Sequence, residues 1–69
     1  MEPLAYIRQG NWLLSTCGRF QIGRMDLWHG RNYCAYDWFP VAGLPYLIDV
    51  AESADAAKLI IERYRETIV

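Results

Sequence analysis

The sequence predicts one α+β domain over residues 1–69, in which an antiparallel sheet of three or four strands carries a single C-terminal amphipathic helix on one face. Two observations predict this class. Near the end of the chain apolar residues recur at helical spacing, whereas upstream short runs rich in aromatic and β-branched residues lie between turn-forming glycines. A domain of 69 residues buries only about 60% of its unfolded surface, so we expect a thin core.

The helix is the clearest element, and it follows a strand predicted at 46–50. Its apolar residues are three or four positions apart, which places them on one stripe. The stripe consists of Ala54, Ala57, Ile61, Tyr64 and Ile68, widened by Ile60. The predicted N-cap is Ser53, whose hydroxyl can accept a hydrogen bond from a free backbone N–H, with Asp55 in the first turn facing the positive end of the helix. A capping box of Asp49 and Glu52 is the competing interpretation.

The first strands are short and are separated by glycine turns. An edge strand is predicted at Leu4–Ile7, before the turn at residues 10–11. A second strand is predicted at Trp12–Ser15, and a turn over residues 17–19 leads into a third strand that begins at Phe20.

The third strand can be read in two ways, because Phe20 and Ile22 share one parity whereas Met25 and Leu27 share the other. A bulge at Gly23 would bring all four side chains to the core, which is a common role for glycine in a strand. Without a bulge, one of the two pairs faces outward.

A further strand at Tyr33–Trp38 follows a turn over residues 28–32 and closes a hairpin with the Phe20 strand. Residues 39–45 contain two prolines and a glycine, which predicts a connection before the last strand. Because one helix covers only one face of a sheet, the other face is expected to expose apolar area. Some of Leu13, Tyr33, Ala35 and Leu47, with Arg24, are expected there.

Composition excludes several classes of protein. The 54% apolar content excludes a disordered tail, and no apolar run approaches the roughly 18 residues of a membrane span. No secretory signal is visible in residues 1–10, so the expected location is the cytoplasm. The two cysteines, Cys17 and Cys34, do not form a disulfide framework, and with a single histidine, His29, they do not predict a zinc site or another cofactor.

The sequence also contains no recognisable set of catalytic residues. Ser15, Thr16 and Cys17 are nucleophile types, but the only histidine, His29, lies in another predicted turn, and no glycine-rich phosphate loop follows a strand. We interpret His29 as a solvated turn residue and Cys34 as a small buried apolar residue. The sequence therefore predicts a protein that is not an enzyme.

Charge is unevenly distributed along the chain. Residues 1–34 hold four basic and two acidic residues, a net charge of +2, whereas residues 35–69 hold three basic and six acidic residues, a net charge of −3. Ten aromatic residues fill much of a thin core, but Trp28, Trp38 and Phe39 lie beside predicted loops. Tryptophan and tyrosine near arginine are typical of interface hot spots.

Two classes of function follow. The first is a protein-binding module, an inhibitor or adaptor, whose partner is another protein or a protein–nucleic acid complex met by an acidic and aromatic patch. That patch would consist of Asp37, Trp38, Phe39, Asp49, Glu52 and Asp55. The second is a nucleic-acid-binding module that uses the open sheet face, with Arg8, Arg19, Arg24, Arg31 and Tyr33. A net charge of −1 disfavours the second class, and a second copy of the chain is a further expected occupant of the open face.

The layout also resembles known small proteins. A strand with Trp12, a Gly18–Ile22 strand, a Tyr33–Tyr36 strand and a closing helix with Ala56 and Ala57 resemble small proteins encoded by phages and other mobile elements. The order is similar to that of the arm-type DNA-binding domains of phage integrases, although those are normally basic, and the size and mild acidity are similar to those of anti-CRISPR proteins. The resemblance implies an inhibitor or adaptor and assigns no role to any residue.

Overall fold

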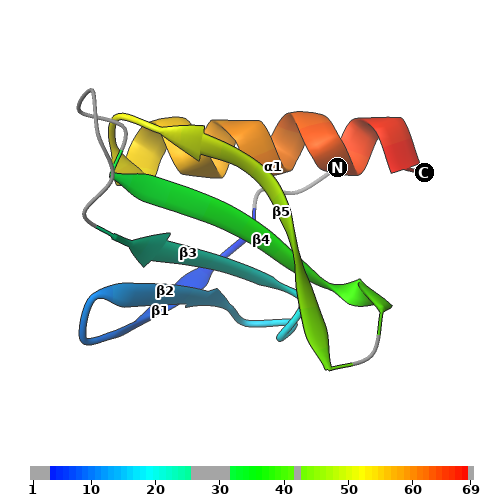
Figure 1. Ribbon diagram of the computed structural model, residues 1–69, viewed down its shortest axis with the longest axis horizontal. Helices are drawn as coiled ribbons and strands as arrows, with labels where there is room; N and C mark the ends of the chain where they lie inside the picture. The colour runs from blue at the N-terminus through cyan, green and yellow to red at the C-terminus, as the bar shows by residue number, and fades with distance from the viewer. Residues whose placement is uncertain (1–3, 26–31, 42, 69) are drawn as a thin grey trace.

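The computed structural model describes residues 4–25, 32–41 and 43–68. These residues form five strands and one helix: β1 (Tyr6–Gln9), β2 (Trp12–Ser15), β3 (Phe20–Arg24), β4 (Tyr33–Val41), β5 (Leu44–Ala51) and α1 (Ala54–Ile68). Each strand pairs antiparallel with the next, in the order β1-β2-β3-β4-β5. The helix packs against β3, β4 and β5, so that it lies toward one side of the sheet (Figure 1).

The predicted α+β class and the C-terminal helix are confirmed, whereas the sheet has five strands rather than three or four. The segment predicted at Leu4–Ile7 is a strand shifted to Tyr6–Gln9, because Gly10, with a φ of 62°, makes a tight turn back to β2. The predicted connection over residues 39–45 is also mostly strand. Pro40 falls where the β4–β5 register shifts, between Asp37 and Val41, and Pro45 lies in β5 at the edge of the sheet, where a missing N–H is tolerated.

The helix begins as predicted. The Ser53 hydroxyl oxygen accepts the N–H of Ala56 at 3.1 Å, which is the N-cap hydrogen bond. The competing capping box is not formed, because the Asp49 carboxylate accepts the N–H of its neighbour Val50 at 2.8 Å. Of the predicted stripe, Ala57 and Ile61 are fully buried, and Ile60 and Tyr64 pack partly buried against the core.

The core lies between α1 and one face of the sheet. Its buried residues come from β3, β4, β5 and α1, and they are Phe20, Ile22, Ala35, Ala51, Ala57 and Ile61. Side chains around them, including Leu13 of β2 and Tyr33 of β4, are partly buried against this cluster. The small alanines let the helix lie close to the strands, as expected for a thin core.

Of the two readings of the third strand, the structure has the one without a bulge at Gly23. Gly23 pairs with Trp12 on one side and Cys34 on the other in an unbroken register, and the irregular positions lie between β4 and β5 instead. A Cβ atom on Gly23 would lie 2.1 Å from the Trp12 ring, so the glycine makes room for the indole. Without a bulge, Phe20 and Ile22 reach the core whereas Met25 is exposed; Leu27 lies outside the described residues.

This register also decides which residues share a face, because directly paired residues of neighbouring strands point to the same side of a sheet. Leu13 and Ala35 both align with Ile22, and Tyr33 pairs with Arg24 and Ala51, so all of these lie on the helix side. The expectation that Leu13, Tyr33, Ala35 and Arg24 lie on the uncovered face is therefore wrong. Leu47, which pairs with Tyr36, is on that face as expected.

Candidate functional site

The uncovered face of the sheet, which we call the open face, is formed by two rows of paired residues and by Trp38. Each row crosses all five strands, and on each strand the residues of the two rows are two or three positions apart. The residues are Ile7, Leu14, Gln21, Tyr36 and Leu47 in the first row, and Gln9, Trp12, Gly23, Cys34 and Val50 in the second. None of these described residues carries a formal charge at neutral pH.

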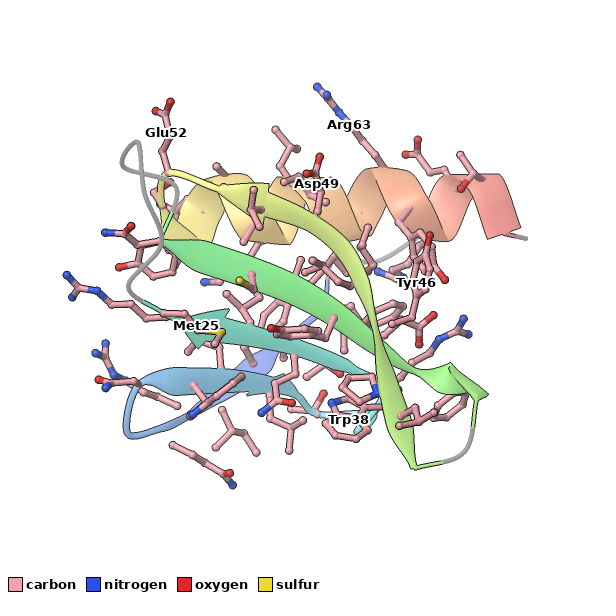
Figure 2. All side chains as sticks on the ribbon, viewed as in Figure 1. Met25, Trp38, Tyr46, Asp49, Glu52 and Arg63 are labelled. Atoms are coloured by element: carbon pink, nitrogen blue, oxygen red, sulfur yellow. The ribbon has the colours of Figure 1, made fainter. Side chains whose placement is uncertain are left out.

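The larger side chains on the open face are held in place by their neighbours. The Trp12 ring lies over Gly23 and is 6.3 Å from the Tyr36 ring between centroids. The Trp38 indole N–H donates to the side-chain oxygen of Gln21 at 2.7 Å, and the label of Trp38 in Figure 2 lies over the strands at a distance from α1. The rings are therefore positioned before any partner arrives, which lowers the entropy lost on binding.

The exposed aliphatic residues complete this surface. Ile7 on β1 is 53% exposed and Leu47 on β5 is 48% exposed, so apolar area extends from one edge strand to the other. Central parts of protein interfaces are depleted in charged residues and enriched in aromatic ones. The open face has both properties.

Arginine and aromatic residues do not meet on this face. Arg8 and Arg24, which align with Leu13 and Tyr33, point to the helix side, and Arg31 lies outside the described residues. The predicted nucleic-acid surface on the open face is therefore wrong in its placement. A shift of one residue exchanges the two faces of a strand, so the open choice about a bulge at Gly23 left no parity signal that could place Arg24.

Asp37 is a core residue rather than a member of an acidic surface. Its side chain is 0% exposed. Arg19 donates from Nε and Nη2 to the two carboxylate oxygens, each at 3.0 Å. The Tyr64 hydroxyl of α1 donates at 2.7 Å and the Phe39 N–H at 3.0 Å. This is a correction to the predicted patch, since a fully buried carboxylate with four hydrogen bonds is not available to a partner.

The same hydrogen bonds control the charge of Asp37. Burial by itself raises the pKa of this carboxyl, but the hydrogen bonds from Arg19, the Phe39 N–H and Tyr64 outweigh burial and hold the pKa below its usual value. Burial and the hydrogen bond to Asp37 raise the pKa of Tyr64. Asp37 is thus ionised and Tyr64 protonated at neutral pH, and together they join β4 to α1.

The rest of the predicted acidic and aromatic patch is spread over the surface. Trp38 is on the open face, whereas Phe39 is 64% exposed with its ring centroid 5.0 Å from the Arg19 guanidinium carbon. Asp49 and Glu52 line a pocket between β5 and α1 that Arg63 also lines, and Figure 2 labels all three residues beside α1 and β5. Asp55 lies in the first turn of α1, 3.9 Å from the Lys58 ammonium group. These groups do not form one surface.

The nucleophile types occupy the turn between β2 and β3. The buried Ser15 hydroxyl oxygen accepts the Phe20 N–H at 2.9 Å, and its oxygen lies 3.3 Å from the Cys17 sulfur. Because that N–H occupies the Ser15 oxygen as acceptor, the Ser15 hydroxyl hydrogen is free to point at Cys17. This hydrogen bond lowers the pKa of the Cys17 thiol. Cys17 is exposed, Cys34 is buried, and both are free thiols.

Within residues 4–25, 32–41 and 43–68 there is no group of three or more metal-binding side chains. Of the helices described there, none is both long and apolar enough to span a membrane. No family model, curated protein or solved structure matches the chain.

Proposed function

We propose that the chain is a small, non-enzymatic protein-binding module, an inhibitor or adaptor, that docks its open face on an apolar and uncharged surface of another protein. The observation that supports this proposal is the absence of charge among the described open-face residues that surround Trp12, Tyr36 and Trp38. Burying this face desolvates no ion, so its burial costs little beyond the ordering of side chains.

The lack of charge on the open face restricts which partner surfaces can bind there. A charged group placed against the centre of the open face would lose its water and find no ionic partner, which disfavours strongly charged surfaces. Hydrogen-bonding groups at Gln21 and at the Tyr36 hydroxyl can pair with polar groups of the partner and so determine its orientation. The same property argues against nucleic acid on this face, because affinity for nucleic acid comes largely from neutralising phosphates.

Charge insertion tests the proposal. Ile7→Lys and Leu47→Lys each place an ammonium group on an exposed position of the open face, at little cost to the core. Leu59→Lys is a matched control, because Leu59 is 54% exposed on α1. Immobilised wild-type protein should retain a partner from an extract of the source cell, and mass spectrometry identifies that partner. The purified partner should bind the two open-face variants at least tenfold more weakly than the wild type, whereas it binds the control normally.

Two results would count against this assignment. If Leu59→Lys weakens binding as much as Leu47→Lys does, general charge and not the open face determines affinity. If the wild-type chain sediments as a dimer that Leu47→Lys converts to a monomer, and no other protein binds, a second copy occupies the open face.

A further inference from the structure

A small pocket lies at the end of the sheet beside the start of α1, on the side opposite to the open face. It has a volume of about 80 Å³ and is lined by residues of β1, the β1–β2 turn, β2, β3, the start of β4 and the first residue of α1. The lining residues include Arg8, Arg24, Tyr33, Gly10 and Ala54. A site needs roughly 10–15 Å³ to hold one water, so this pocket can hold a group of several heavy atoms.

Both charged residues of the pocket are cationic. None of its lining residues is acidic, and among the described residues neither Arg8 nor Arg24 forms an ion pair. Arg19 and Arg65 differ from them, because Arg19 is paired with Asp37 and Arg65 with Glu62. Two guanidinium groups at one concave site, without a described carboxylate between them, favour an anionic occupant.

The geometry of the two guanidinium groups leaves hydrogen-bond donors available. Arg8 donates from Nε to the Gly10 carbonyl at 3.3 Å, which holds the group while its terminal nitrogens stay available. The Arg24 guanidinium carbon is 5.9 Å from the centroid of the Tyr33 ring. A guanidinium that lies over an aromatic face can still bind an oxyanion through the N–H groups at its edge.

The start of α1 adds to the positive potential. Ala54 is the first residue of this 15-residue helix, and the first N–H groups of a helix have no partner within it. The acidic residue of the first turn, Asp55, lies close to Lys58 instead of lining the pocket. The start of α1 therefore adds positive potential to that of the two arginines, which are the main anion-binding groups of the pocket.

We propose that this pocket binds a single phosphoryl group, the terminal phosphate of a small phosphate monoester. Its volume accommodates one tetrahedral group. Two arginines give the bidentate, charge-assisted hydrogen bonds that phosphate oxygens accept. This proposal does not depend on the proposed function, although Trp12 of the open face also lines the pocket.

Amide chemical shifts at pH 7 and constant ionic strength can test the pocket, with inorganic phosphate and glycerol 3-phosphate as the titrants. We expect saturable shifts at the backbone amides of Gly10, Arg24 and Ala54 in the millimolar range. Arg8→Gln and Arg24→Gln should each weaken phosphate binding by about tenfold or more, since each removes a charge-assisted hydrogen bond. Both are exposed, and an unchanged amide spectrum of the rest of the chain verifies folding.

Arg63→Gln is the matched control, because it removes the same charge from an exposed position on α1 that does not line this pocket. Phosphate affinity should be unaffected by it. The proposal is overturned if phosphate gives no saturable shift, or if Arg63→Gln weakens binding as much as the pocket variants. A short single-stranded oligonucleotide without terminal phosphates, bound more tightly than glycerol 3-phosphate at the same amides, would also overturn it in favour of a nucleic-acid backbone.

Discussion

At the scale of single residues, Cys17 shows how one hydrogen bond changes chemistry without forming an active site. The Ser15 oxygen is fixed by the Phe20 N–H, so its own hydrogen can stabilise a thiolate on Cys17. The turn contains Gly18 with a φ of 78°, a left-handed conformation that suits glycine and exposes the sulfur. Such a thiol becomes reactive when it ionises to the thiolate without a general base, because no histidine is among its described neighbours.

We predict that Cys17 is alkylated much faster than Cys34 and that its rate rises at a lower pH than that of a free cysteine, whose pKa is about 8.5. The hydrogen bond from Ser15 lowers the pKa of Cys17, so more thiolate is present at neutral pH, whereas Cys34 is buried. The measurement is iodoacetamide labelling against pH by mass spectrometry. Cys17→Ser should abolish the fast reaction, and equal rates at both cysteines would contradict the assignment.

At the scale of elements, the contact between β2 and β3 depends on a missing side chain. Gly23 sits directly opposite Trp12 and leaves the space that the indole fills. This close contact holds the Trp12 ring against the open face, where it meets Tyr36. Gly23 therefore acts through packing and not through an unusual backbone, since it lies within the regular β3 strand.

Gly23→Ala should lower the free energy of unfolding by about 1–3 kcal/mol, the usual cost of overpacking. The new methyl group would require the Trp12 ring to move, because its carbon would lie 2.1 Å from the ring. Urea denaturation of the single and double variants measures this. In a Trp12→Ala background the same glycine substitution should cost much less. An identical cost in both backgrounds would show that Trp12 is not the cause.

How far the sequence predicts these elements depends on the range of the signal. The α1 stripe and the Ser53 cap follow from spacing within a few residues, and both are confirmed. The faces of the sheet depend on parity along each strand. Local spacing did not decide whether β3 contains a bulge at Gly23, and Arg24 was expected on the wrong face. Local pattern therefore predicted where the strands are better than which way they face.

At the scale of the whole molecule, Asp37 connects parts of the chain that the sequence does not bring together. Its partners Arg19 and Tyr64 are 18 and 27 positions away, in the turn before β3 and in α1. No local pattern marks a carboxylate for burial, because the property arises only when these three residues meet. From its acidic side chain alone, Asp37 was expected on a binding surface. In the structure its hydrogen bonds to Arg19 and Tyr64 make it a link between the sheet and the helix.

This link should make stability depend on acid. The folded pKa of Asp37 is below its unfolded value of about 3.9, so its stabilisation is fully present above that pH and is lost as the pH falls through the folded pKa. Asp37→Asn should cost about 3–5 kcal/mol at neutral pH and flatten the acid limb of the stability curve.

Tyr64→Phe removes only the 2.7 Å hydrogen bond from α1, so it keeps the ion pair and should cost less, about 1.5–3 kcal/mol. Asp55→Asn, at an almost fully exposed carboxylate, is the control and should leave the curve nearly unchanged. Urea unfolding by circular dichroism from pH 7 to pH 2 measures all four proteins. If Asp37→Asn does not fold, Tyr64→Phe still tests the link, because its folded Asp37 loses a stabilising donor and its acid limb must move to higher pH. An acid limb of Tyr64→Phe that coincides with that of the wild type would exclude Asp37 as the source of the pH dependence.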